Sequence, residues 1–64
     1  MNSLELRGLI GSIRLQQLKG QKTVEETISA LQNIDWNSVE EFEVCPIATL
    51  QTVVNDYIQK LNTP

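Results

Sequence analysis

The residues with the greatest potential for chemistry gather in one stretch of the chain, residues 33–46, which reads NIDWNSVEEFEVCP. This stretch contains the only cysteine, Cys45, together with Trp36 and Phe42, two of the three aromatic residues. It also contains half of the acidic residues, which are Asp35, Glu40, Glu41 and Glu43. Residues of these types could build a metal site, a reactive thiol or a surface that docks another protein.

The spacing of these acids excludes a calcium loop. An EF-hand loop that started at Asp35 would require a glycine at its sixth position and a bidentate glutamate at its twelfth. Glu40 and Pro46 occupy those positions. A structural zinc site needs four ligands, mostly cysteine and histidine, and the chain has one cysteine and no histidine. We therefore predict no metal site, no cofactor and no cofactor-binding residues.

The thiol of Cys45 stands immediately before Pro46, where a helix is expected to begin, and a cysteine beside a helix N-terminus can be reactive. The nearby acids Glu41 and Glu43 would oppose a negatively charged thiolate. Free cysteine is also among the residue types most often buried. The sequence therefore predicts that Cys45 is a buried part of the core.

Catalysis lacks the groups it needs in this chain. There is no histidine to act as a base near neutral pH, and no glycine-rich phosphate loop of the GxxxxGKS type. The paired acids are adjacent in sequence, so on a helix they point about 100° apart instead of toward one substrate. We predict a non-enzymatic protein without catalytic residues.

A docking surface is the remaining interpretation of residues 33–46. Tryptophan is strongly enriched at the energetic centres of protein interfaces, and an aromatic anchor with a charged rim is common there. The alternative is structural, because in so small a core a tryptophan beside a turn can cover the end of a helix bundle. The predicted partner-binding residues are Trp36, Phe42, Glu40, Glu41 and Glu43.

The charge is distributed unevenly along the chain. The net charge is −3, but residues 1–22 carry +3 and residues 23–64 carry −6. Arg7 and Arg14 lie seven residues apart and share a helix face, which could contact phosphates. This suggests an alternative function, a small DNA-binding transcriptional regulator that uses its basic N-terminal helix. The acidic net charge, and Glu25 and Glu26 at the start of the next helix, make nucleic acid the less favoured partner.

Apolar periodicity predicts the elements that position these residues. Residues 3–19 have apolar side chains at helical spacing, with Ser3 as the expected N-cap and Gly20 after the C-terminus. Thr23 and Glu26 form the sequence pattern of a capping box, so a second helix is expected over 23–33. The turn between them is short, which predicts an antiparallel hairpin.

Two further helices are expected in the second half of the chain. Ser38 and Glu41 have the spacing of a capping box, which predicts a short helix near 38–44. Pro46 suits the first position of a final helix over 46–62, whose apolar residues alternate at spacings of three and four. The expected fold is all-α, a single domain of residues 1–64 built as a small three- to four-helix bundle.

The small size of the chain favours self-association. A domain of 64 residues buries little surface, and it usually needs a disulfide, a metal, very regular packing or a partner copy. We therefore expect a cytoplasmic, helix-mediated protein-binding module (an adaptor, inhibitor or regulator) that forms a homodimer and binds a protein partner, with no membrane segment. The predicted self-association residues are Gly8, Gly11, Leu50, Val54, Tyr57 and Leu61.

Overall fold

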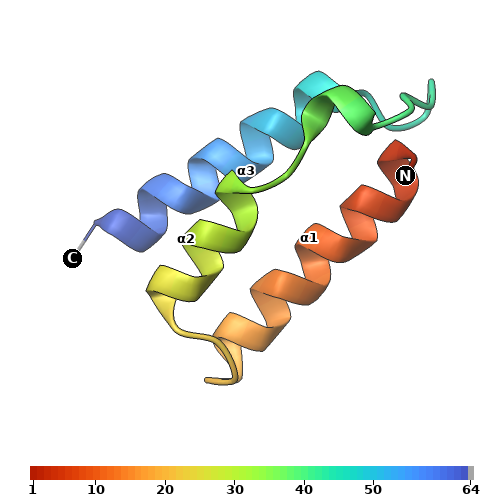
Figure 1. The fold of residues 1–64 in the computed structure, drawn as a ribbon. Helices are drawn as coiled ribbons and strands as arrows, with labels where there is room; N and C mark the ends of the chain where they lie inside the picture. The colour runs from red at the N-terminus through yellow and green to blue at the C-terminus, as the bar shows by residue number, and fades with distance from the viewer. Residues whose placement is uncertain (64) are drawn as a thin grey trace.

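The computed structural model, which describes residues 1–63, contains three α-helices and one turn of 3-10 helix. The elements are α1 (Ser3–Leu18), α2 (Val24–Gln32), η1 (Trp36–Ser38) and α3 (Ile47–Asn62). In Figure 1, α1 and α2 form an antiparallel hairpin, and α3 returns in the same direction as α1. The predicted all-α fold and the helical hairpin are confirmed. No helix among residues 1–63 is long and apolar enough to cross a bilayer.

The first helix begins one residue earlier than predicted. Its N-cap is Asn2, not Ser3, because Asn2 and Glu5 form a reciprocal capping box. The side chain of Asn2 accepts a hydrogen bond from the Glu5 amide at 2.8 Å. Ser3 is instead fully buried, and its hydroxyl accepts a hydrogen bond from the distant amide of Phe42 at 2.9 Å. The side chain of Ser3 thus holds the loop before α3 against the start of α1.

The C-terminus of α1 ends in a Schellman motif, as the glycine after Lys19 predicted. Gly20 has a φ of +76°, a left-handed conformation that glycine adopts without steric cost. The amide of Gly20 donates to the carbonyl of Gln17 at 3.1 Å, and the amide of Gln21 donates to that of Gln16 at 2.9 Å. These two bonds satisfy carbonyls that the helix would otherwise leave free, and they turn the chain toward α2.

The second helix starts with the predicted capping box. The Thr23 hydroxyl accepts from the Glu26 amide, and the Glu26 carboxylate accepts from the Thr23 amide, both at 3.1 Å. The Thr23 amide, followed by the Thr23 hydroxyl group, lowers the pKa of Glu26 because these contacts favour the charged carboxylate. Thr27 is fully buried, and its hydroxyl donates to the Thr23 carbonyl at 2.8 Å. The start of α2 is therefore fixed by local hydrogen bonds.

The short helix predicted near 38–44 does not form. Asp35 accepts a hydrogen bond from the Ser38 hydroxyl at 2.6 Å. The Ser38 side chain therefore binds the N-cap residue of η1 and does not cap a new helix. The backbone of Glu40 then pairs with the N-terminus: its amide donates to the Met1 carbonyl, and its carbonyl accepts from the Ser3 amide. These contacts hold residues 39–45 in an extended and turning path instead of a helix.

The three helices share one small core. Its seven buried apolar residues come from α1, α2, α3 and the loop before α3, and they are Leu6, Ile10, Ile13, Leu31, Cys45, Leu50 and Val54. Cys45 is buried, as predicted, and its thiol donates a weak hydrogen bond to the Ser3 carbonyl at 3.6 Å. Pro46 is the N-cap of α3 and not its first residue, so α3 begins at Ile47, one residue later than predicted. Within residues 1–63, every buried polar side-chain atom has a hydrogen-bond partner.

Candidate functional site

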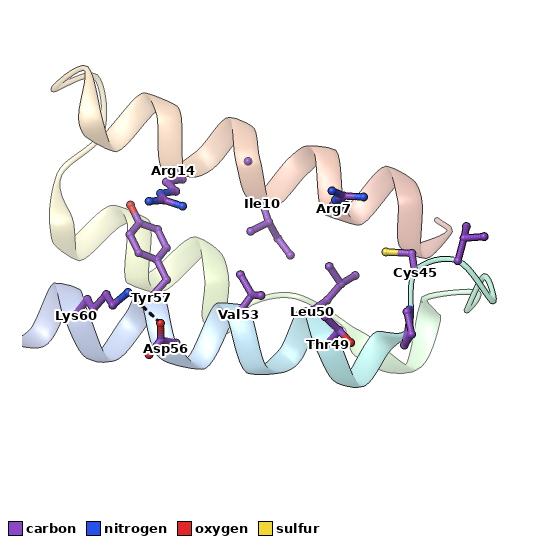
Figure 2. A pocket seen from close by; sticks show the side chains of 13 residues that line it. Arg7, Ile10, Arg14, Cys45, Thr49, Leu50, Val53, Asp56, Tyr57 and Lys60 are labelled. Atoms are coloured by element: carbon purple, nitrogen blue, oxygen red, sulfur yellow. Dashed lines mark ion pairs between the residues drawn. The ribbon is translucent and has the colours of Figure 1, made fainter.

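A groove with a volume of about 590 Å³ lies between α1 and α3. Figure 2 shows Ile10 of α1 pointing across this groove toward Leu50 and Val53 of α3. Ile10 and Leu50 are buried, whereas Val53 is 48% exposed and Val44, in the loop before α3, is 78% exposed. The groove therefore has an apolar floor that solvent reaches along its open side.

Tyr57 crosses the groove near the C-terminal ends of both helices. Its hydroxyl donates a hydrogen bond to the side-chain oxygen of Gln17 on α1 at 3.0 Å. The guanidinium carbon of Arg14 lies 5.7 Å from the centroid of the Tyr57 ring, within the range of a cation–π interaction. At the opposite end, the segment Val44–Pro46 contributes to the wall. The groove is thus bounded along its length, over about two helical turns between Arg7 and Arg14.

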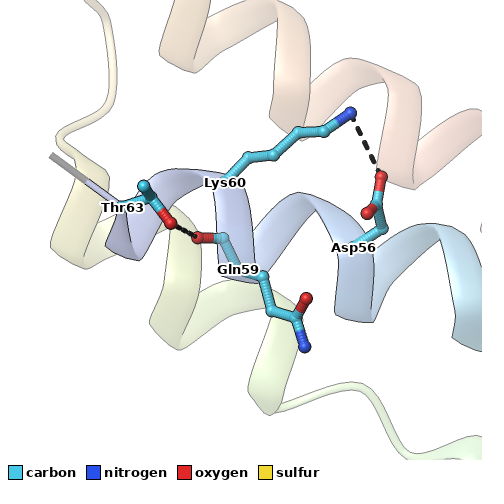
Figure 3. A network of polar contacts seen from close by, with 4 residues as sticks. All are labelled: Asp56, Gln59, Lys60 and Thr63. Carbon is cyan, nitrogen blue, oxygen red and sulfur yellow. Dashed lines mark hydrogen bonds and ion pairs between the residues drawn. The ribbon is translucent and has the colours of Figure 1, made fainter.

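The rim of the groove carries a net positive charge. Arg7 and Arg14 line the α1 side, and within residues 1–63 neither forms an ion pair. Lys60 and Asp56 line the α3 side, and they pair with each other at 3.1 Å (Figure 3). Because this pair is neutral as a whole and well exposed, it adds little to the field of the rim. The two arginines are the charges that an approaching partner would meet.

A second apolar surface lies on the outer side of α1. With about 100° between successive residues, five positions fall on an arc of about 80°, centred roughly 140° away from the buried residues of the same helix. Three of them are leucines, Leu4, Leu15 and Leu18, which are 41%, 52% and 67% exposed. The outer stripe, as we call this surface, consists of Leu4, Gly8, Gly11, Leu15 and Leu18.

Both predicted glycines lie on the outer stripe and face open space. A Cβ atom added to Gly8 or Gly11 would meet no heavy atom of the rest of the chain within 4 Å. No helix of the same chain therefore packs on them, although their cost to helix stability, about 1 kcal/mol each relative to alanine, remains. This patch is available to another molecule.

The other predicted self-association residues are used within the chain. Leu50 and Val54 are buried in the core, and their side chains already pack against α1 and α2. Tyr57 and Leu61 are half-buried. A seam through Leu50 and Val54 would require the core to open, so these two residues do not form a free surface. The apolar spacing of α3 predicted its buried face correctly, but it did not reveal which neighbour would cover it.

The predicted partner-binding residues have mainly structural contacts. Trp36 is half-buried and packs against the core, and Phe42 is half-buried in the turn before Cys45. The Glu41 carboxylate accepts a hydrogen bond from the Ile47 amide at 2.8 Å, which caps α3 in place of a side chain at Pro46. Glu40 is held through its backbone, and Glu43 is exposed. These residues do not converge on one concave site.

Sequence reasoning missed the groove and two of its exposed apolar residues, Val44 and Val53. Val53 directly precedes Val54, which belongs to the buried face of α3. An apolar residue next to a buried position is the one signal in the sequence for an exposed apolar side chain on this helix. Among residues 1–63, no group of three or more histidine, cysteine or acidic residues could hold a metal ion. No known protein family, curated protein or solved structure matches this chain. Function must therefore be inferred from the geometry.

Proposed function

We propose that this chain is a cytoplasmic, non-enzymatic protein-binding module that works through helix–helix contacts and pairs with a second copy through the outer stripe of α1. The observation that carries the proposal is the exposure of this stripe. Three leucines and two glycines at alternating spacings of four and three point away from the core. This is the spacing with which one helix packs along another.

The pattern of the outer stripe is self-complementary. In an antiparallel pair related by a two-fold axis between Gly8 and Gly11, each glycine faces the other glycine of the second copy. Leu4 then faces Leu15 of the second copy, and Leu18 faces Met1, which is 61% exposed. A closed two-fold dimer requires one surface that complements itself, and this order of large and small residues provides it.

The size of the contact indicates a weak dimer. The glycines allow the two backbones to approach closely, and each half-exposed leucine that becomes buried contributes roughly 1 kcal/mol. One pair of short helices is a small interface, so we expect a dissociation constant on the order of 10 to 100 µM. Self-association at this strength depends on local concentration, which suits an adaptor or regulator.

Sedimentation of the purified protein over about 5 to 500 µM tests the proposal. We expect the average mass to rise from monomer to dimer and to stop there. Leu15→Glu should keep the protein monomeric throughout the range, because it places a charge opposite Leu4. Leu9→Glu is the matched control: Leu9 is a similarly exposed leucine of α1 outside the stripe, at 42%. A wild-type monomer at the highest concentration would refute the proposed pairing.

A further inference from the structure

The geometry points to a second binding surface: we propose that the groove between α1 and α3 receives an amphipathic helix from another protein, with acidic residues along the edge that faces α1. This inference goes beyond self-association, because it names a different partner and a surface that overlaps the outer stripe only at Gly11. Each chain builds the whole groove by itself, so the proposal does not depend on the dimer.

The apolar lining of the groove suits a helix. Helices pack with their axes about 8 to 10 Å apart, and a helix docked in a groove places apolar anchors at spacings of three, four and seven. Val44 and Val53 are large apolar side chains of the wall that are exposed to solvent. Gly11, which lines the α1 side, has no side chain to hold the partner away. An occupant of about three turns would cover the floor from the start of α3 to Tyr57.

The positive charge of the rim favours a partner helix that has acidic residues along one edge. Arg7 and Arg14 are separated by seven residues, or about 10 Å along α1. A carboxylate pair with the same separation on a helix lying along α1 can contact both guanidinium groups, which form strong, often bidentate hydrogen bonds with carboxylates. Asp56 on the opposite rim is already paired with Lys60. The acidic edge of the partner should therefore face α1 and not α3.

A second copy of this chain does not supply such a helix. The only acid in α1 is Glu5, and the only acid in α3 is Asp56. In α2 the acids are the adjacent Glu25 and Glu26, and Glu26 already belongs to the capping box. None of these helices carries two acids separated by two turns on one face. The occupant must therefore be a different polypeptide.

Selection from a displayed library of helical peptides tests the proposal. Each peptide has leucine, alanine or valine at the anchor positions and random residues at the flanking positions. We expect the binders to be enriched in aspartate or glutamate at two flanking positions seven residues apart. Enrichment of basic or uncharged flanks would overturn the proposal, and so would the absence of any enrichment. A short DNA duplex that binds more tightly than the selected peptides would identify a nucleic-acid surface instead.

Variants of the groove connect the selected peptide to its proposed site. Val53→Asp should weaken binding at least about tenfold, whereas Val24→Asp, at an exposed valine of α2 outside the groove, should leave it unchanged. Arg7→Glu with Arg14→Glu should reverse the preference from glutamate to lysine flanks. Arg7→Gln with Arg14→Gln should abolish the preference and leave the helicity unchanged. If these arginine substitutions left peptide binding unchanged, the proposed orientation of the partner helix, with its acidic edge toward α1, would be wrong.

The monomeric variant separates this proposal from self-association. At protein concentrations too low for dimerisation, Leu15→Glu should bind the selected peptide as tightly as the wild type does, because Leu15 does not line the groove. If the wild type binds the peptide but never dimerises, the proposed groove is retained and the proposed dimer is refuted. Peptide binding that is lost in Leu15→Glu would show that the groove needs the second copy, which contradicts the proposal.

Discussion

Arg14 and Tyr57 connect α1 to α3 across the end of the groove, with the guanidinium carbon 5.7 Å from the centroid of the ring. The Tyr57 hydroxyl adds a hydrogen bond to Gln17, also on α1. In Figure 2, α1 and α3 lie farther apart toward their C-terminal ends, where these contacts connect the two helices. Tyr57 therefore bridges the two walls of the groove at this end.

Two substitutions of Tyr57 should separate the contributions of its ring and of its hydroxyl group to the free energy of unfolding. Tyr57→Phe removes one partly buried hydrogen bond, and we expect a loss of about 0.5 to 1.5 kcal/mol in the free energy of unfolding. Tyr57→Ala also removes the packing of the ring and the contact with Arg14, so the loss should rise to roughly 2 to 4 kcal/mol. Urea denaturation followed by circular dichroism measures both. Equal losses for the two variants would mean that the ring does not stabilise the α1–α3 contact.

Ser3 offers a test of the contact between the N-terminus and the loop before α3. Ser3→Ala removes the acceptor of the Phe42 amide and leaves that amide without its partner. We expect a loss of about 1 to 3 kcal/mol in the free energy of unfolding. Asn2→Ala is a suitable comparison, because it removes only a helix cap and should cost about 1 kcal/mol. Hydrogen exchange should show faster exchange of the Phe42 amide in Ser3→Ala alone.

The capping box of α2 predicts a specific dependence of stability on pH. The pKa of Glu26 is lower in the folded protein than its ordinary value, because the Thr23 amide and hydroxyl favour the carboxylate. The contribution of the charged group is therefore complete above the pKa of the unfolded chain, and it is lost as the pH falls through the folded pKa. The difference in stability between the wild type and Glu26→Ala should be constant near neutral pH and should shrink in acid.

The control for this prediction is Glu26→Gln, which keeps an acceptor at the same position without a titrating charge. The difference between Glu26→Gln and Glu26→Ala should not vary with pH. Carbon-detected NMR titration of the Glu26 carboxyl group checks the sign directly, with an expected midpoint below the ordinary value of 4.5. A midpoint above that value would show that the reciprocal hydrogen bonds do not persist in solution.

Local patterns in the sequence predicted most of the helical structure. The capping box at Thr23, the glycine after Lys19 and the apolar spacing of Leu50 and Val54 all depend on residues within a few positions of each other, and each was confirmed. The pattern at Ser38 was equally local but failed, because Asp35 binds the Ser38 hydroxyl. Competition between neighbouring caps cannot be resolved from spacing alone.

Contacts between distant residues could not be predicted in the same way. The path of residues 39–45 is set by hydrogen bonds to Met1 and Ser3, about forty positions earlier, and helical periodicity contains no information about such pairs. The groove has the same origin. Spacing showed that α1 and α3 each have an apolar face, but the groove is bounded by contacts between distant residues, Tyr57 with Gln17 and Cys45 with Ser3. For the same reason, spacing alone predicts a contact between copies at Leu50 and Val54, whereas the structure buries both residues in the core.

Arg7 and Arg14 lie close to both proposed surfaces. We therefore expect salt to affect dimerisation and peptide binding in opposite directions. In the antiparallel pair, Arg7 lies within about two residues' rise of Arg14 of the second copy, so like charges approach twice across the axis. Each such approach costs a few tenths of a kcal/mol, and salt screens it. We expect the dimer to become about two- to fivefold tighter when potassium chloride is raised, while the groove binds the acidic peptide more weakly.

The same charges should couple the two binding events. An acidic helix in the groove neutralises Arg7 and Arg14, which removes the repulsion that opposes the dimer, and by linkage the dimer then binds the helix more tightly by the same factor. Sedimentation of the wild type with a saturating acidic peptide should show a tighter dimer at low salt and little change at high salt. The matched control is Arg7→Gln with Arg14→Gln, whose self-association should depend on neither salt nor peptide. A wild-type dimer that weakens as salt rises would mean that attraction between opposite charges, and not the apolar stripe, joins the two copies.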